Sequence, residues 1–309
     1  MKNQKKTISI GISVYNEVGN IENLLYSIIR QDKTEFNLEA IYVICDGTND
    51  GTDILVEKLA QKFSIIRLLN DGKRKGKIRR LSELFKLNLS DVLMILDGDV
   101  VLGKSNTINE VVKCFEKKGV FLVSANNQPV KGDTLVGKII NYSIYIWYFV
   151  RLSFNYGDNI YNARNCCIAL RKEFVSKINF PPQIHSYGRY LYLLCQQEKQ
   201  KFVFAKNALI LYRKPNNIRE YIMQTRGPFS DKEKFEEIFG NWIKNKYKIP
   251  LKYKLLAILN TFTQNPFLFI SSVTLKFIIK QFPFRSISSK NSAVWETVIS
   301  TKKPISVPF

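Results

Sequence analysis

The chain has 309 residues, of which 45% are hydrophobic, so it can bury a sizeable core and is not an intrinsically disordered protein. Its 47 Lys and Arg residues outnumber 26 Asp and Glu residues, which gives a formal net charge of +21. Such a charge favours polyanions or an anionic membrane surface as partners. We predict no nucleic-acid binding, because the basic residues are dispersed and no helix-turn-helix, zinc-finger or RNP motif accompanies them.

The five cysteines form no Cys-x-x-Cys pair, and the chain has one histidine, so we do not expect a Cys/His zinc site. Reduced thiols in the cytosol are the expectation. The basic N-terminus leads through a short apolar run into a strand pattern, and we therefore expect no signal peptide.

Strand and helix patterns alternate along the first half of the chain. We expect strands at residues 7–14, 38–45, 65–69, 92–96 and 120–125. Helices are expected at residues 20–31, beyond an N-cap at Asp50, after the basic loop 71–77, and at residues 107–115. Because such alternation requires crossover connections, it predicts an α/β fold with a mostly parallel sheet flanked by helices.

The apolar run 92–96 stops at Asp97-Gly98-Asp99. Open α/β sheets bind ligands at the carboxyl ends of their strands. Mg²⁺ is usually held by one or two carboxylates together with substrate phosphates, so this pair fits a metal-diphosphate anchor. An ordinary β-turn is the alternative, and the position after a buried strand favours the anchor.

Four motifs follow one another within the first third of the chain: residues 13–17 (SVYNE), 46–52 (DGTNDGT), 76–77 (GK) and 97–99 (DGD). Together they resemble a family 2 glycosyltransferase with the Rossmann-like GT-A fold, which binds nucleotide sugars. The resemblance implies a metal-dependent transferase that moves a sugar from a UDP- or GDP-sugar to an acceptor hydroxyl. Its implied cofactor is Mg²⁺ or Mn²⁺.

The resemblance also implies roles for individual residues. Tyr15, Glu17 and Asp46 would meet the nucleoside, Lys77 would lie near the phosphates, and Asp99 would hold the metal. Asp97 would face the ribose or sugar and take part in catalysis, and Ser13 belongs to the first donor-binding motif. Arg226 lies in a partial match to the Gln-x-x-Arg-Trp motif of processive relatives and would help to hold the diphosphate. Turn, cap and surface roles stay open for Asp46, Asp50 and Lys77.

Relatives usually carry an acidic pair before an apolar helix on the acceptor side, whereas residues 184–193 (IHSYGRYLYL) contain no carboxylate. An inverting transferase normally needs a general base there. His185 is the only histidine, and imidazoles titrate near neutral pH, so we predict it as the candidate catalytic base. A structural role for His185 stays open, and Asp158 and Glu198 are the substitutes.

Two segments suggest contact with a membrane. Residues 137–154 are rich in aromatic side chains and flanked by Lys138 and Arg151, as in an interfacial helix, with an aromatic-rich core helix as the alternative. Residues 255–279 are apolar but interrupted by polar residues, which favours a peripheral helical appendage over one short span.

We therefore predict a GT-A domain at residues 1–230 and a helical, membrane-associated region at 231–309. Within the first domain, residues 1–128 form the nucleotide-sugar-binding half and 129–230 the acceptor-side half. The predicted function is glycosyl transfer to a glycan or lipid-linked acceptor, in cell-surface glycan, glycolipid or polysaccharide synthesis at the cytosolic face of a membrane. The alternative is a degenerate transferase that binds nucleotide sugar without turnover.

Overall fold

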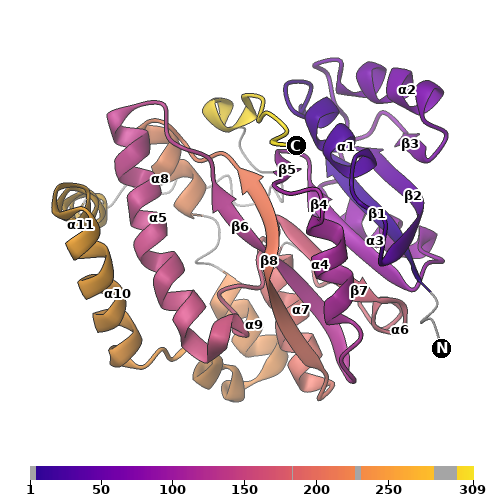
Figure 1. The fold of residues 1–309 in the computed structure, drawn as a ribbon. Helices are drawn as coiled ribbons and strands as arrows, with labels where there is room; N and C mark the ends of the chain where they lie inside the picture. The colour runs from indigo at the N-terminus through magenta and orange to yellow at the C-terminus, as the bar shows by residue number, and fades with distance from the viewer. Residues whose placement is uncertain (1–4, 183, 227–230, 282–297) are drawn as a thin grey trace.

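The computed structural model describes residues 5–182, 184–226, 231–281 and 298–309, except for the side chains of residues 225, 226, 280, 281 and 299. Within these ranges, eight strands form one sheet in the order β3-β2-β1-β4-β7-β6-β8-β5 (Figure 1). The strands are β1 (Lys6–Val14), β2 (Phe36–Cys45), β3 (Ile66–Asn70), β4 (Val92–Asp97), β5 (Val100–Leu102), β6 (Val120–Pro129), β7 (Cys167–Arg171) and β8 (Lys201–Tyr212).

Helices cover both faces of this sheet (Figure 1). They are α1 (Ile21–Ile29), α2 (Thr52–Lys62), α3 (Lys77–Leu87), α4 (Thr107–Cys114), α5 (Leu135–Ser153), α6 (Lys172–Val175), α7 (Tyr187–Gln197), α8 (Ile218–Arg226), α9 (Asp231–Phe239), α10 (Leu251–Gln264) and α11 (Pro266–Gln281). Three 3₁₀ segments complete the described elements: η1 (Phe154–Gly157), η3 (Asn241–Tyr247) and η4 (Ile299–Lys302).

The strands β3, β2, β1 and β4 are parallel, so their carboxyl ends share one edge of the sheet. Ser13 at the end of β1 pairs with Asp97 at the end of β4. Successive side chains of a strand point to opposite faces. In β4, accordingly, Met94 and Leu96 belong to one buried apolar cluster, and Leu93 and Ile95 belong to the other. A strand buried on both faces therefore delivers Asp97 to the edge of the sheet.

The second half of the chain departs from simple alternation. Strand β7 is inserted antiparallel between β4 and β6, and β8 runs parallel to β6. Strand β5 follows β4 after two residues and pairs antiparallel with β8. The predicted mostly parallel α/β sheet is confirmed. Its antiparallel strands are β7 and β5, which lie in the half of the sheet beyond β4.

In the first half of the chain, most of the predicted strand and helix ends lie within two residues of the ends in the structure. One local prediction is wrong: α2 is preceded by Gly51, which has a positive φ of 87°, rather than capped by Asp50. The Asp50 side chain instead accepts hydrogen bonds from Thr52 N at 3.0 Å and from Val18 N at 3.1 Å. Asp50 therefore ties the loop before α1 to the start of α2.

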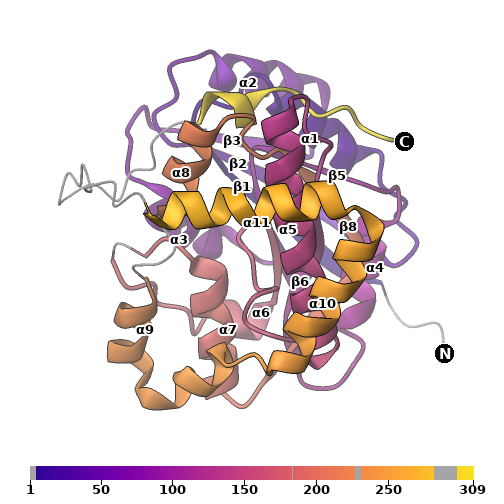
Figure 2. The same ribbon diagram turned by 90° about the vertical axis from the view of Figure 1, so that its left-hand side faces the viewer.

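The aromatic segment predicted to lie on lipid headgroups forms α5, which lies between the sheet and the α10–α11 pair (Figures 1 and 2). The Tyr145 hydroxyl donates to Gln264 Oε1 at 2.8 Å, and the Tyr142 hydroxyl donates to the Thr261 carbonyl at 2.5 Å. These contacts favour the packed-helix interpretation of residues 137–154. The outer layer on this side is α10 and α11, which no other described helix or strand covers in Figure 2.

Among the described helices, none combines the length and apolar character that crossing a bilayer requires. Residues 298–309 return to the region of β1 and α1, far from α11 in the fold (Figure 1). This brings a late segment of the chain to the edge of the sheet that carries Asp97.

Candidate functional site

The Asp97-Gly98-Asp99 turn joins β4 to β5 at the carboxyl edge of the sheet. A Cβ atom on Gly98 would lie 2.8 Å from Glu17 Cγ and 2.9 Å from Val14 Cγ1, so no larger residue fits without displacing both. The Asn20 side-chain amide donates to the carbonyls of Gly98 and Val100 at 3.1 and 3.0 Å. The turn is thus fixed by packing and by hydrogen bonds, which holds its two carboxylates in place.

Two carboxylates and a lysine meet at this turn. Lys77 Nζ lies 2.9 Å from Asp97 Oδ1 and donates to the Ser13 carbonyl at 3.2 Å. Burial raises the pKa of Asp99 and the nearby Asp97 carboxylate raises it further, although the charge of Lys77 works against both. A cation beside the pair would relieve this repulsion. The turn therefore has the electrostatics of a cation site.

Glu17 is a second buried carboxylate at the turn, with a relative exposure of 6%. Burial, reinforced by the charge of Asp99, raises its pKa to about 8. Its Oε1 atom accepts a hydrogen bond from Lys302, whereas Oε2 is buried and has no hydrogen-bond partner among the described residues. An orphaned buried oxygen of this kind is costly unless a ligand or ion engages it.

Tyr15 directly follows β1 at the same edge of the sheet, and the guanidinium of Arg74 lies 3.6 Å from the centroid of the Tyr15 ring. The close approach depends on Gly47, because a Cβ there would lie 2.9 Å from the backbone nitrogen of Arg74. An aromatic ring and a guanidinium stacked in this way form a flat platform. Such a platform suits a planar base.

Asp46 organises the loop that leads into α3. Its Oδ1 accepts hydrogen bonds from the backbone of Lys75 at 2.7 Å and of Gly76 at 3.0 Å, and from Arg80 Nε at 3.0 Å. Arg80 is only 2% exposed and also pairs with Asp71 and Glu83. Asp46 therefore positions the start of α3, and a contact between Asp46 and a nucleoside stays a prediction.

The predicted acceptor side of the site lies at the N-terminus of α7. His185 Nδ1 lies 3.2 Å from Asp231 Oδ1, and the other oxygen of Asp231 accepts from the backbone N–H groups of His185 and Ser186 at 2.9 and 2.5 Å. The Asn165 side chain donates to the His185 carbonyl at 2.8 Å. Asp231 is fully buried, so His185 is held by a carboxylate that water does not reach.

Tyr187 links this acceptor side to the carboxylate turn. Its hydroxyl donates to the Asn165 carbonyl and lies 3.5 Å from Asp97 Oδ1. The Asn165 side chain in turn accepts from Gly188 N at 2.9 Å. His185 and Asp97 therefore belong to neighbouring parts of one polar cluster.

Residues 9–178, more than half of the chain, match the model of the family described as Glycosyl transferase family 2. The chain belongs to this family. A comparison with curated protein sequences finds no match.

Solved structures of glycosyltransferases share the fold of this family 2 chain. A mannosyltransferase from Pyrobaculum calidifontis, in complex with GDP-Man and Mn²⁺, is 15% identical, with a TM-score of 0.59 over 90% of this chain and 76% of its own. A glucosyl-3-phosphoglycerate synthase from Mycobacterium tuberculosis, in complex with Mg²⁺ and UDP, is 16% identical, with a TM-score of 0.53 over 76% of this chain and 80% of its own. The fold is GT-A, as the motifs predict.

Several residues of the site were not found by sequence reasoning. Arg164 donates to the Tyr212 hydroxyl at 3.2 Å, and Lys214 donates to Gln224 Oε1 at 2.7 Å. Arg164 interacts electrostatically with Asp97, and Lys214 interacts electrostatically with Asp99. These two cations and Lys77 therefore all place positive charge near the carboxylate turn. Tyr187, Asp231 and Lys302 are the other residues of the site that the sequence analysis did not predict.

Other predicted residues have a different place or no described one. Glu198 follows the last turn of α7, at the opposite end from His185, and pairs with Lys177 at 2.8 Å. Asp158 lines a hollow near the same far end of α7 and accepts from Phe204 N at 2.6 Å. Both carboxylates therefore lie at the end of α7 opposite to His185. Arg226 is the last residue of α8, and its side chain lies outside the described residues.

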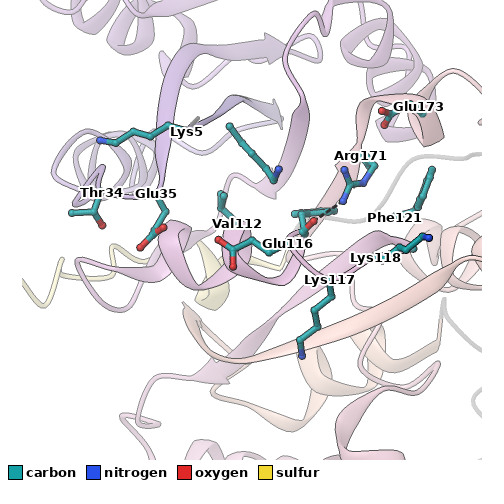
Figure 3. A pocket seen from close by; sticks show the side chains of 13 residues that line it. Lys5, Thr34, Glu35, Val112, Glu116, Lys117, Lys118, Phe121, Arg171 and Glu173 are labelled. Carbon is teal, nitrogen blue, oxygen red and sulfur yellow. Dashed lines mark hydrogen bonds between the residues drawn. The ribbon is translucent and has the colours of Figure 1, made fainter. Parts of the chain in front are cut away.

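A hollow of about 560 Å³ opens at the other edge of the sheet (Figure 3). Its lining includes Lys5 and Lys6 at the start of β1 and Arg171, which pairs with Val92 at the start of β4. This is the edge opposite Asp97. Arg171 is engaged there by the carbonyls of Phe115 and Val120. The hollow is therefore not part of the carboxylate site.

Proposed function

We propose that this chain transfers a sugar from a nucleoside-diphosphate sugar to an acceptor hydroxyl. The observation that carries the proposal is the pair Asp97 and Asp99 at the carboxyl end of β4, with the ammonium of Lys77 2.9 Å from Asp97. Carboxylates for a metal and cations for a diphosphate are what such a donor requires. The structural neighbours, bound to GDP-Man or UDP with Mn²⁺ or Mg²⁺, support the same donor class.

The carboxylate turn suits Mg²⁺ or Mn²⁺ held by Asp99. In the described residues, no group of three or more His, Cys, Asp and Glu side chains could hold a metal. Mg²⁺ does not need one, because it often binds through one or two carboxylates and substrate phosphates. The raised pKa of Asp99 and the unpartnered Oε2 of Glu17 fit a site completed by a cation. When bound, the metal supplies positive charge for the leaving nucleoside diphosphate.

The chain's own residues would bind and orient the donor. Tyr15 with Arg74 offers a platform for the base, and Glu17 lies beside it. Lys77, at the start of α3, adds its charge to the positive end of the helix near the phosphates. Asp97 would orient the ribose or sugar through the oxygen that Lys77 holds. Ser13 and Asp46 shape the strand end and loop around them, and Arg226 would reach the diphosphate from α8.

For the acceptor, His185 is the general base of an inverting transfer. Its contact with Asp231 at 3.2 Å resembles the arrangement in which a carboxylate orients an imidazole and stabilises its protonated form. The acceptor hydroxyl would give its proton to His185 as the hydroxyl oxygen attacks the anomeric carbon and the diphosphate leaves. A base held in this way gives no support to a degenerate binder.

A large apolar surface lies on α10 and α11. Its exposed apolar side chains are Leu251, Leu255, Leu256, Ile258, Leu259, Phe262, Phe267, Ile270, Val273, Phe277 and Ile278. Monomeric soluble proteins rarely expose so many large apolar side chains together. Lys252 and Lys254 are exposed on the same α10 helix, which favours an anionic lipid surface over an apolar protein partner.

We therefore place the protein peripherally on the cytosolic face of a membrane, where lipid-linked or glycan acceptors for cell-surface glycan, glycolipid or polysaccharide synthesis are found. Aromatic and aliphatic side chains of α10 and α11 would enter the headgroup layer while α5 stays packed beneath them. In this proposal, the α10–α11 surface binds the protein to the membrane, and the carboxylate turn takes part in the transfer reaction.

The test is release of nucleoside diphosphate from a panel of UDP- and GDP-sugars, with Mn²⁺ and with a chelator. We expect metal-dependent release from at least one donor, because water can act as a slow acceptor. Binding of a donor without release or transfer, even with lipid-linked acceptors present, would favour the degenerate binder. No binding of any donor would reject the proposal.

A further inference from the structure

Residues 298–309 lie across the donor edge of the sheet (Figures 1 and 2). Ile305 N donates to Asn20 Oδ1 at 3.0 Å, and the same Asn20 side chain holds the Gly98 carbonyl at 3.1 Å. Arg213 at the end of β8 donates to the Pro304 carbonyl at 2.9 Å. One asparagine thus joins this segment to the carboxylate turn.

Residues 298–309 pack closely against the rest of the protein. A Cβ atom on Gly19 would lie 2.6 Å from the Lys302 carbonyl oxygen, so the backbone approach depends on glycine at that position. Asn216 N donates to Ser300 Oγ at 3.2 Å, and Ser300 also contacts Glu220 of α8. The segment therefore bridges the loop before α1 and the start of α8.

Lys302 points from this segment into the donor site. Its Nζ atom pairs with Glu17 Oε1 and lies 3.4 Å from the Tyr15 carbonyl. Its side chain is about one quarter exposed, and its charge reaches Asp99 as well as Glu17. The ammonium thus stands among the residues proposed to hold the nucleoside and the metal.

We propose that Lys302 is a donor-site residue that binds the diphosphate group of the nucleotide. This inference rests on the proposed function. A lysine ammonium has three N–H donors, so it can keep its contacts with Glu17 and Tyr15 and still donate to a phosphate oxygen. A cation in this place would offset the charge that grows on the diphosphate as the sugar leaves.

The structural alternative is that Lys302 only neutralises Glu17. That carboxylate is buried, and a buried charge without a partner is strongly destabilising. Both roles would make Lys302 important for folding, so a loss of stability in a Lys302 variant does not separate them. The two roles are distinguished by whether the variant weakens binding of the diphosphate group or binding of the nucleoside.

The test is calorimetric binding of UDP, uridine, GDP and guanosine, each in the presence of Mn²⁺, to the full chain and its Lys302→Met variant. We expect the affinity for the diphosphate to fall by about tenfold or more, as for a lost charged hydrogen bond, and the affinity for the nucleoside to stay unchanged. Lys303→Met is the matched control, because this exposed neighbour contributes its backbone carbonyl to Arg213, and both affinities should stay unchanged.

Glu17→Gln removes the charge that Lys302 pairs with, and the double variant Glu17→Gln with Lys302→Met completes the comparison. We expect the double variant to bind the diphosphate about tenfold more weakly than Glu17→Gln alone. Equal binding by these two variants, or equal losses for diphosphate and nucleoside in Lys302→Met, would overturn the inference and leave the proposed function standing. A wild type that binds neither diphosphate would overturn both.

Discussion

His185 Nδ1 lies 3.2 Å from Asp231 Oδ1, although 46 positions of the chain separate the two residues. The contact forms because Asp231 is the first residue of α9, which packs against α7, and His185 lies directly before the N-cap of α7. His185, the predicted base, thus has a carboxylate partner that comes from another helix.

The first prediction concerns turnover. His185→Ala should lower kcat by about 10² to 10⁴, the usual loss for a general base, while the affinity for the nucleoside diphosphate stays the same. Steady-state rates, with calorimetry for donor binding, check both points. Near-normal turnover in the variant would make His185 structural.

The second prediction concerns acid stability. Burial works to raise the pKa of Asp231, but hydrogen bonds from His185 and Ser186 outweigh it and hold the pKa below the ordinary 3.8. A lowered folded-state pKa means that ionised Asp231 stabilises the fold fully above its unfolded-state pKa. This stabilisation is lost as the pH falls through the folded-state value.

Urea unfolding of the wild type and of Asp231→Asn at pH 7, 5 and 3 measures this contribution. We expect the wild type to be more stable at pH 7 and 5, and the difference to shrink at pH 3. A difference that does not change across the three pH values would show that the charge of Asp231 contributes nothing to the stability.

The third prediction concerns the α10–α11 surface. The wild type should float with anionic vesicles and be released as salt rises, because basic residues near such a surface contribute about 1 kcal/mol each. Replacing Leu259 and Phe267, each 65% exposed, with Ser should abolish flotation. Ile54→Ser is the matched control, since Ile54 is 57% exposed on α2 and away from this surface.

Flotation that survives the Leu259 and Phe267 changes, or that the Ile54 change reduces equally, would contradict this surface as the membrane contact. If the two changes instead alter the size of the protein in light scattering without affecting vesicle binding, the surface binds a second copy of the chain.

The donor half of the site was predictable because its signals are local. Strand β4 has an uninterrupted apolar run that ends at Asp97, which predicted a buried strand with a carboxylate at its end. The structure adds that Ser13, on the parallel strand β1, pairs with Asp97. The Gly76-Lys77 pair is likewise a short-range signal for the start of α3. These residues lie at the ends of the strands and at the start of the helix that the sequence predicted, and their roles in donor binding stay predictions.

The remainder depends on contacts between distant parts of the chain. Asp231 and Lys302 lie in segments whose own sequences carry no motif, and each reaches the site only because α9 and residues 298–309 pack against it. The same holds for α5, whose aromatic residues suit a membrane surface as well as a protein interior. Helix α5 lies inside the protein because α10 and α11 cover it, and the sequence of α5 alone does not show this.

The most direct test of the donor site is a calorimetric titration of the wild type and of Asp99→Ala with UDP and GDP, each with and without Mn²⁺. We expect the wild type to bind one of these nucleotides far more tightly when Mn²⁺ is present. Asp99→Ala should keep its fold by circular dichroism and lose that metal-dependent gain. Unchanged affinity in the variant, with a wild type that requires the metal, would contradict the assignment of the metal to Asp99.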